Sequence, residues 1–79
     1  MATRAFVLIE TAVGKTKDVV ATLRNVREVT SVDAVTGPYD IIAIVDAKDL
    51  TSVGDIVTGR IHTAPGIVKT VTCLAVSLP

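Results

Sequence analysis

Apolar residues fall in four short runs that predict β-strands. Residues 5–10 are apolar on both faces, whereas residues 29–36 alternate so that each face mixes polar and apolar side chains, a pattern typical of an edge strand. The faces of this second strand comprise Val29, Ser31, Asp33 and Val35 on one side and Thr30, Val32, Ala34 and Thr36 on the other. Residues 41–46 are too short to span a membrane and predict a central strand buried on both faces. Residues 67–78 predict a long final strand.

Two stretches between these strands show helical spacing. Either Gly14, which breaks the strand pattern, or Thr16 is expected to cap the first helix. The apolar face of this helix comprises Val19, Val20, Leu23 and Val26. Asp49 or Thr51 is expected to cap the second helix, whose apolar face comprises Leu50, Val53, Ile56, Val57 and Ile61. The sequence Ala-Pro-Gly at residues 64–66 ends this helix because proline and glycine disfavour its continuation.

The order of these elements, β-α-β-β-α-β, predicts the ferredoxin-like plan of the α+β class. The short connection at residues 37–40 makes the second and third strands an antiparallel hairpin. In this plan a four-stranded antiparallel sheet carries both helices on one face. The other face is left bare, although the strands at 5–10 and 41–46 are apolar there too. Pairing of two sheets would bury it, so we expect a homodimer, a dimeric α+β barrel.

Length and composition agree with this expectation. A single domain spanning residues 1–79 buries only about 60% of the surface of its unfolded chain. Because 49% of the residues are hydrophobic, a subunit interface is the natural place for the excess. The 8 basic and 8 acidic residues balance, which argues against direct nucleic-acid binding. The N-terminus lacks the apolar core of a signal peptide and the single cysteine, Cys73, cannot form an internal disulfide, so we expect a cytoplasmic protein that does not enter membranes.

Three short motifs link the chain to a known family. Gly14 precedes the first predicted helix, Val35-Thr36-Gly37-x-Tyr39-Asp40 forms the hairpin turn, and Pro65-Gly66-Ile67 precedes Thr70-x-Thr72. In this order and spacing, over nearly the whole chain, they resemble the effector-binding and oligomerisation domain of the Lrp/AsnC transcriptional regulators, the RAM domain. The chain begins at the first strand of that module, so the resemblance is to stand-alone versions that have no DNA-binding domain.

The resemblance implies a non-catalytic sensing and oligomerisation module without a cofactor or metal. In the family, dimers pair their sheets and assemble further into rings such as octamers, and an amino acid or related small metabolite binds in a cleft between dimers. A stand-alone copy would modulate amino-acid-responsive transcription by homo-assembly or by joining full-length Lrp/AsnC regulators. The positions that match the effector site of the family are Thr36, Gly37, Tyr39, Asp40, Thr70 and Thr72.

The chemistry of these residues is compatible with an amino-acid ligand. The Asp40 carboxylate can accept from an ammonium group, and backbone N–H groups around Gly37 can donate to a carboxylate because glycine permits close approach. Thr70 and Thr72 lie two residues apart on a strand, so their hydroxyls share one face. The same residues also have a purely structural interpretation, in which Asp40 caps the turn and the threonines are ordinary strand formers.

Two other functions stay open on the sequence. Small dimeric α+β-barrel enzymes of the antibiotic-biosynthesis-monooxygenase type have the same topology. Here only Phe6, Tyr39 and His62 could furnish their cavity, and no paired nucleophile and base can be identified. A ligand-free assembly module is the other alternative. We expect His62 to be a structural residue after the second helix and Cys73 to be a small buried thiol in the last strand.

Overall fold

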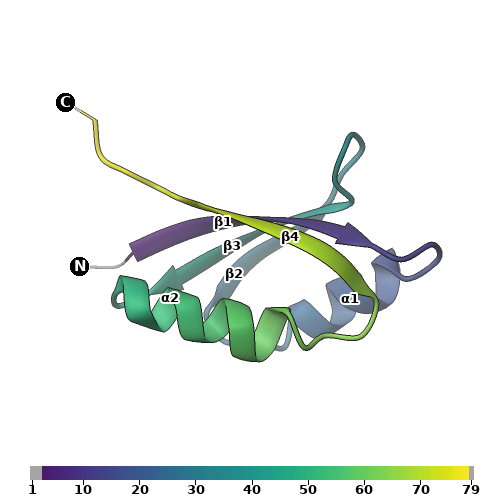
Figure 1. The fold of residues 1–79 in the computed structure, drawn as a ribbon, viewed down its shortest axis with the longest axis horizontal. Coiled ribbons are helices and arrows are strands. Elements are labelled where there is room, and N and C mark those ends of the chain that lie inside the picture. Colours follow the sequence, from purple (N-terminus) through teal and green to yellow (C-terminus); the bar gives the residue numbers. More distant parts are fainter. Residues whose placement is uncertain (1–2, 79) are drawn as a thin grey trace.

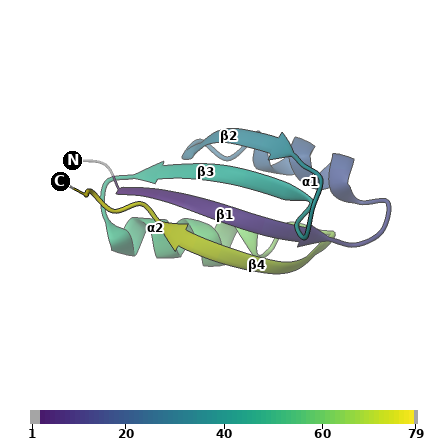
Figure 2. The ribbon, with the colours of Figure 1, turned by 90° about the horizontal axis from the view of Figure 1, so that it is seen from above.

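The computed structural model describes residues 3–78. β1 (Thr3–Thr11) is followed by α1 (Thr16–Leu23), the hairpin of β2 (Val29–Ala34) and β3 (Ile41–Ala47), α2 (Leu50–Ile56) and β4 (Ile67–Leu74). This βαββαβ order confirms the ferredoxin-like plan predicted from the sequence. The strands form one antiparallel sheet in the order β2-β3-β1-β4, so β3 is central and β2 is an edge strand, as predicted. Both helices cover the same face of the sheet (Figure 1, Figure 2).

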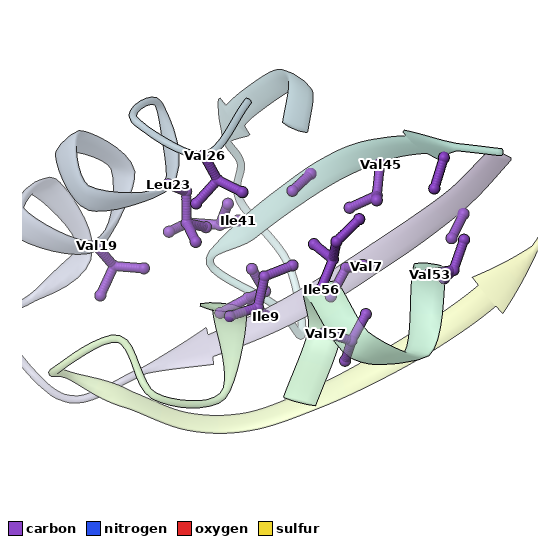
Figure 3. Packing of buried hydrophobic residues seen from close by; sticks show 14 residues of the cluster. Val7, Ile9, Val19, Leu23, Val26, Ile41, Val45, Val53, Ile56 and Val57 are labelled. Atoms are coloured by element: carbon purple, nitrogen blue, oxygen red, sulfur yellow. The ribbon is translucent and has the colours of Figure 1, made fainter. Parts of the chain in front are cut away.

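The hydrophobic core lies between the sheet and the two helices. Alternate residues of the central strands point into it, and the apolar sides of α1 and α2 meet them (Figure 3). The largest fully buried side chains are those of Val7, Ile9, Val19, Leu23, Ile41, Val45, Val53 and Ile61. Helical spacing therefore predicted the buried sides correctly, except at Leu50, which is 60% exposed at the mouth of a groove between α2 and β4. Within residues 3–78, no helix is long and apolar enough to cross a membrane.

The face of the sheet opposite the helices, called the open face below, is apolar at its centre. Its central residues are Phe6, Leu8, Ile42, Ile44, Val71 and Cys73. β3 alternates between buried residues that face the helices and half-buried residues on the open face. Within one chain β3 is therefore buried on one face, and the burial predicted for its other face depends on a second subunit. The prediction that Cys73 is a buried thiol is wrong for the single chain, because Cys73 is exposed on this face.

A bulge in β2 changes which of its residues face the core. Val29 pairs with Val45, but Ser31 pairs with Ile44, so Thr30 is an extra residue with no partner of its own in the register. As a result, the two valines of the strand, which strict alternation placed on opposite faces, both pack against the core. The alternation predicted for this strand is wrong because the bulge shifts its phase by one residue. The strand also ends two residues earlier than predicted.

The helix caps are predicted correctly for one helix only. The N-cap residue of α1 is Lys15, which makes no capping hydrogen bond with its side chain, so neither Gly14 nor Thr16 has the expected role. In α2 the Asp49 carboxylate accepts the Ser52 N–H at 2.8 Å, as predicted. This hydrogen bond lowers the pKa of the Asp49 carboxyl below its ordinary value.

Gly66 connects the start of β4 to the start of α1. Its φ is +97°, and a Cβ there would lie 2.9 Å from the Cβ of Lys15 and 3.2 Å from Cγ2 of Val19. The carbonyl of Gly66 accepts the N–H of Ala12 at 2.8 Å. Both the left-handed backbone and the close packing require glycine at this position. The Pro65-Gly66-Ile67 motif is therefore explained by the fold, without any contact to a ligand. β4 then runs to Leu74, four residues short of the predicted end.

Candidate functional site

The turn between β2 and β3 contains four of the six expected effector-binding residues. Its base is closed by the Val35 N–H, which donates to the Asp40 carbonyl at 2.9 Å, and the Asp40 N–H donates to the Ile9 carbonyl on β1 at 2.9 Å. Thr36 and Gly37 are exposed, and Gly37 has a φ of +126°, a conformation that glycine adopts readily. Tyr39 and Asp40 are half-buried. The turn is thus anchored at its base and presents backbone and hydroxyl groups at its tip.

The carboxylate of Asp40 holds this anchor. Oδ2 accepts the backbone N–H of Thr11 at 2.8 Å and the Thr11 hydroxyl at 3.2 Å. Thr11 Oγ1 also lies 2.7 Å from Thr16 Oγ1. Because the single hydroxyl proton of Thr11 is directed to Asp40, Thr16 is the donor in that contact. Asp40 therefore ties the hairpin to the end of β1 and, through Thr11, to the first turn of α1.

Thr11 is the residue of this cluster that sequence reasoning missed. It is 9% exposed, and the described residues contain no other buried polar residue. A threonine at the end of an apolar strand carried no distinctive signal, and its carboxylate partner lies 29 positions away in the sequence. The hydrogen bonds satisfy a polar group that would otherwise be costly to bury.

Thr70 and Thr72 lie on the side of β4 that faces the helices. The hydroxyl of Thr70 is 2.7 Å from Nε2 of His62, the residue that follows the π-helical turn (η1, Val57–Ile61) at the end of α2. This contact agrees with the structural role expected for His62. Thr72 instead lines an apolar groove of about 270 Å³ between α2 and β4, whose other lining residues are Leu50, Val53, Gly54, Val57, Thr58 and Leu74.

The six expected residues therefore occupy separate places in one chain. Ile41, at the end of the turn, pairs with Ile9, which in turn pairs with Thr70. Two strand spacings separate the turn from Thr70, a distance of about 10 Å, and Thr72 lies roughly 7 Å farther along β4. The four turn residues come together, whereas the two threonines belong to the helix-facing side of the opposite edge.

An ion pair lies at one end of the open face. Nε and Nη2 of Arg4 donate to the two carboxylate oxygens of Asp46 at 2.9 and 3.2 Å. This hydrogen-bonded contact raises the pKa of the Arg4 guanidinium and lowers the pKa of the Asp46 carboxyl, which the Thr30 hydroxyl also contacts. Sequence reasoning did not identify the pair because its members are 42 positions apart. Nowhere in residues 3–78 do three His, Cys, Asp or Glu residues gather as metal ligands would.

Comparison with known proteins identifies the family. The family model described as the Lrp/AsnC ligand binding domain matches residues 4–79. TTHA0845 from Thermus thermophilus is 34% identical, with a TM-score of 0.91 over 98% of this chain and 96% of that chain. The hypothetical protein PHS023 from Pyrococcus horikoshii is 33% identical, with a TM-score of 0.89 over 99% of this chain and 93% of that chain. No curated protein sequence gives a significant match.

A more distant structure shares the fold alone. The feast or famine regulatory protein from M. tuberculosis, complexed with L-methionine, is 23% identical, with a TM-score of 0.82 over 96% of this chain and 51% of that chain. The chain spans about half the length of this regulator. Since the family model covers nearly all of the chain, the resemblance drawn from the sequence motifs is confirmed. The chain belongs to the Lrp/AsnC ligand binding domain family.

Proposed function

We propose that this chain is a non-catalytic module that binds an amino acid or a related small metabolite and couples that binding to assembly. The observation that carries the proposal is the anchored turn at residues 36–40, which presents Thr36, Gly37 and Tyr39 on a base held by Asp40. The family membership supports it, because the matching model is that of a ligand binding domain. The L-methionine complex of the M. tuberculosis regulator supports the choice of amino acids as the ligand class.

The groups of the turn have distinct proposed roles. Backbone N–H groups around Gly37 donate to the ligand carboxylate, and the hydroxyls of Thr36 and Tyr39 complete the polar contacts. Asp40 supplies the negative charge for the ligand ammonium while Oδ2 keeps its contacts with Thr11. We keep Thr70 and Thr72 in the proposal as residues that line a second wall of the ligand cleft. A cleft built between subunits does not require that residues from one chain converge, so their separation from the turn is compatible with it.

The assembly we propose begins with a homodimer that buries the open face. Phe6 is 36% exposed at its centre, with Leu8, Ile42 and Ile44 half-buried around it. A contiguous apolar surface of this kind on a small domain marks an interaction site. Dimers would then form a ring, such as an octamer, with the turns at the contacts between dimers. Joining full-length Lrp/AsnC regulators is the proposed route by which the module modulates transcription.

One observation favours a second candidate, a ligand-free assembly module. Asp40 and Thr70 already have partners within the chain, Thr11 and His62 respectively, so both are explained without a ligand. The two candidates differ in a measurable way. A sensor is stabilised by its effector, whereas a ligand-free module is not stabilised by any amino acid.

A thermal-shift panel with each common amino acid at millimolar concentration separates these candidates. A ligand at ten times its dissociation constant stabilises the folded state by about 1.4 kcal/mol, which raises the melting temperature by several degrees. We expect a shift for one or a few chemically related amino acids, lost in Tyr39→Phe or Thr36→Val. Thr22→Val, which removes an exposed hydroxyl on α1 that donates to the Asp18 carbonyl, serves as the matched control and retains the shift. A flat panel with an intact oligomer would favour the ligand-free module.

A further inference from the structure

The second wall of the proposed cleft contains a polar pocket at the edge of the sheet. The pocket has a volume of about 310 Å³, lies at the start of β4, and is lined by His62, Ile67, Val68, Lys69 and Thr70. Among the described residues that line it, none is acidic and Lys69 is cationic. The pocket therefore favours an electron-rich group, and it is separate from the apolar groove that Thr72 lines.

A π-helical turn brings His62 to this pocket. The His62 N–H donates at 2.8 Å to the carbonyl of Val57, five residues earlier, whereas an α-helix would bond to the residue four positions earlier. One extra residue shifts the residues after it by about 100° around a helix axis. In the observed arrangement Nε2 of His62 lies 2.7 Å from Oγ1 of Thr70. Such turns occur frequently at functional sites, and this one joins the end of α2 to the edge of β4.

The contact with His62 leaves Thr70 with hydrogen-bonding groups to spare. A threonine hydroxyl has one proton to donate and two lone pairs that accept. When Nε2–H of His62 donates to Oγ1 of Thr70, the Thr70 proton is free to donate to a third group. Both the neutral ring with its proton on Nε2 and the doubly protonated ring make this donation. In either form, His62 orients the Thr70 hydroxyl as a donor toward the pocket.

The backbone of Thr70 adds a second donor and an acceptor. The Ala75 N–H donates to the Arg4 carbonyl of β1 at 2.9 Å. Because successive residues of a strand direct their N–H and C=O groups to opposite sides, those of Thr70, five residues earlier, point away from β1. β4 is the edge strand of the sheet described for residues 3–78, so no strand of that sheet lies on this side (Figure 2). Thr70 thus offers a hydroxyl, an N–H and a carbonyl at one place.

We propose that Thr70, positioned by His62, binds the end of the ligand side chain, and that this side chain ends in a carbonyl oxygen, as a carboxylate or a carboxamide. The inference rests on the proposed function, in which the turn at residues 36–40 holds the α-ammonium and α-carboxylate, so that the second wall meets the side chain. The ligand oxygen accepts from the hydroxyl and the N–H of Thr70. A carboxamide also donates to the Thr70 carbonyl, whereas a carboxylate is favoured by Lys69, whose charge Glu10 beside it on β1 partly offsets.

Isothermal titration calorimetry of the wild type and four variants tests this role. The ligands are aspartate, asparagine, glutamate and glutamine, with leucine and methionine as apolar counterparts of similar size. We expect at least one of the four polar amino acids to bind more tightly than both apolar ones. His62→Ala and Thr70→Val should each weaken the binding of that polar ligand about tenfold and leave the affinity for leucine and methionine unchanged. His62→Gln keeps a donor near the position of Nε2 and Thr70→Ser keeps the hydroxyl, so both should retain most of the affinity.

The outcomes separate this inference from the proposal on which it rests. A wild type that prefers leucine or methionine to all four polar amino acids would overturn the inference, assign the side chain to the apolar groove and leave the amino-acid sensor in place. Equal weakening of every ligand in His62→Ala and Thr70→Val, or no weakening, would also overturn it, because a structural role does not distinguish ligands. A wild type that binds no amino acid would overturn both proposals together. Thr22→Val is the control for loss of an exposed hydroxyl, and circular dichroism confirms that each variant is folded.

Discussion

The backbone N–H of Thr11 donates to the carboxylate of Asp40 across a distance of 2.8 Å, joining the end of β1 to the turn that precedes β3. This hydrogen bond connects the stability of the fold to the geometry of the candidate site. We expect Asp40→Ala to destabilise the protein by roughly 1–3 kcal/mol, because it leaves the half-buried N–H without an acceptor. Urea denaturation measures this loss through the transition midpoint at constant slope.

The negative charge of the Asp40 side chain and its role as a hydrogen-bond acceptor can be tested separately. Asp40→Asn keeps an oxygen that can accept from Thr11, so we expect it to retain most of the stability lost in Asp40→Ala. If the carboxylate also holds the ligand ammonium, Asp40→Asn weakens amino-acid binding by tenfold or more, about 1.4 kcal/mol or greater. Unchanged binding in a stable Asp40→Asn variant would assign Asp40 a structural role alone.

Two glycines, one closely packed and one in open space, provide a prediction about stability. Gly66→Ala forces a φ near +97° on a residue with a Cβ, and that Cβ would approach Lys15 to 2.9 Å. We expect a loss of about 1–3 kcal/mol in the free energy of unfolding. Gly54→Ala is the matched control, because nothing lies within 4 Å of a Cβ built there and the residue is inside α2. Gly54→Ala should raise the free energy of unfolding by roughly 0.5–1 kcal/mol. An equal effect of Gly66→Ala and Gly54→Ala on stability would contradict the structure.

The pH dependence of stability follows from two carboxyls. The Arg4 hydrogen bond lowers the pKa of Asp46, and the Ser52 N–H lowers the pKa of Asp49. A lowered pKa in the folded state means that the unfolded state binds protons more readily, so stability is fully present above the ordinary value of 3.8 and is lost as pH falls through the lower folded pKa. We expect Asp46→Asn to be less stable than the wild type at neutral pH and to approach it in strong acid. A constant difference at all pH values would contradict this linkage.

The open face, which the proposed homodimer buries, gives a prediction about assembly. Ile44→Asp places a charge among apolar side chains at the centre of that face, so we expect it to produce a folded monomer by analytical ultracentrifugation. Leu50→Asp is the control, because Leu50 is 60% exposed and lies outside the open face. A dimer that survives Ile44→Asp unchanged would show that another surface carries the assembly.

Hydrophobic periodicity was sufficient to predict the order of the elements and the sides of both helices. Leu23 and Val53 are buried as their helical spacing indicated, and Asp49 caps α2. The bulge at Thr30 was not predictable, because one extra residue in an alternating strand leaves no mark in its composition. The exposure of Cys73 depends on which face of β4 meets the helices, and residue type alone does not specify that face.

The candidate site was predictable only in part. Gly, Pro and Asp at residues 37–40 indicated a turn, and the structure has one there. The contacts of Asp40 with Thr11 and of Thr70 with His62 join residues from different elements, and a hydrogen-bond partner across a sheet has no local signature. For the same reason, the sequence did not reveal that Thr72 would line a groove apart from the turn.

The most direct test of the central claim is to map the backbone amide resonances of the wild-type protein by NMR as each amino acid is added. We expect one or a few related amino acids to shift resonances that cluster at residues 36–40, with a second set at Thr70 and Thr72. Saturation of those shifts with concentration would establish a specific site. The absence of any saturable shift, or saturable shifts that leave residues 36–40 unchanged, would contradict the proposed effector site.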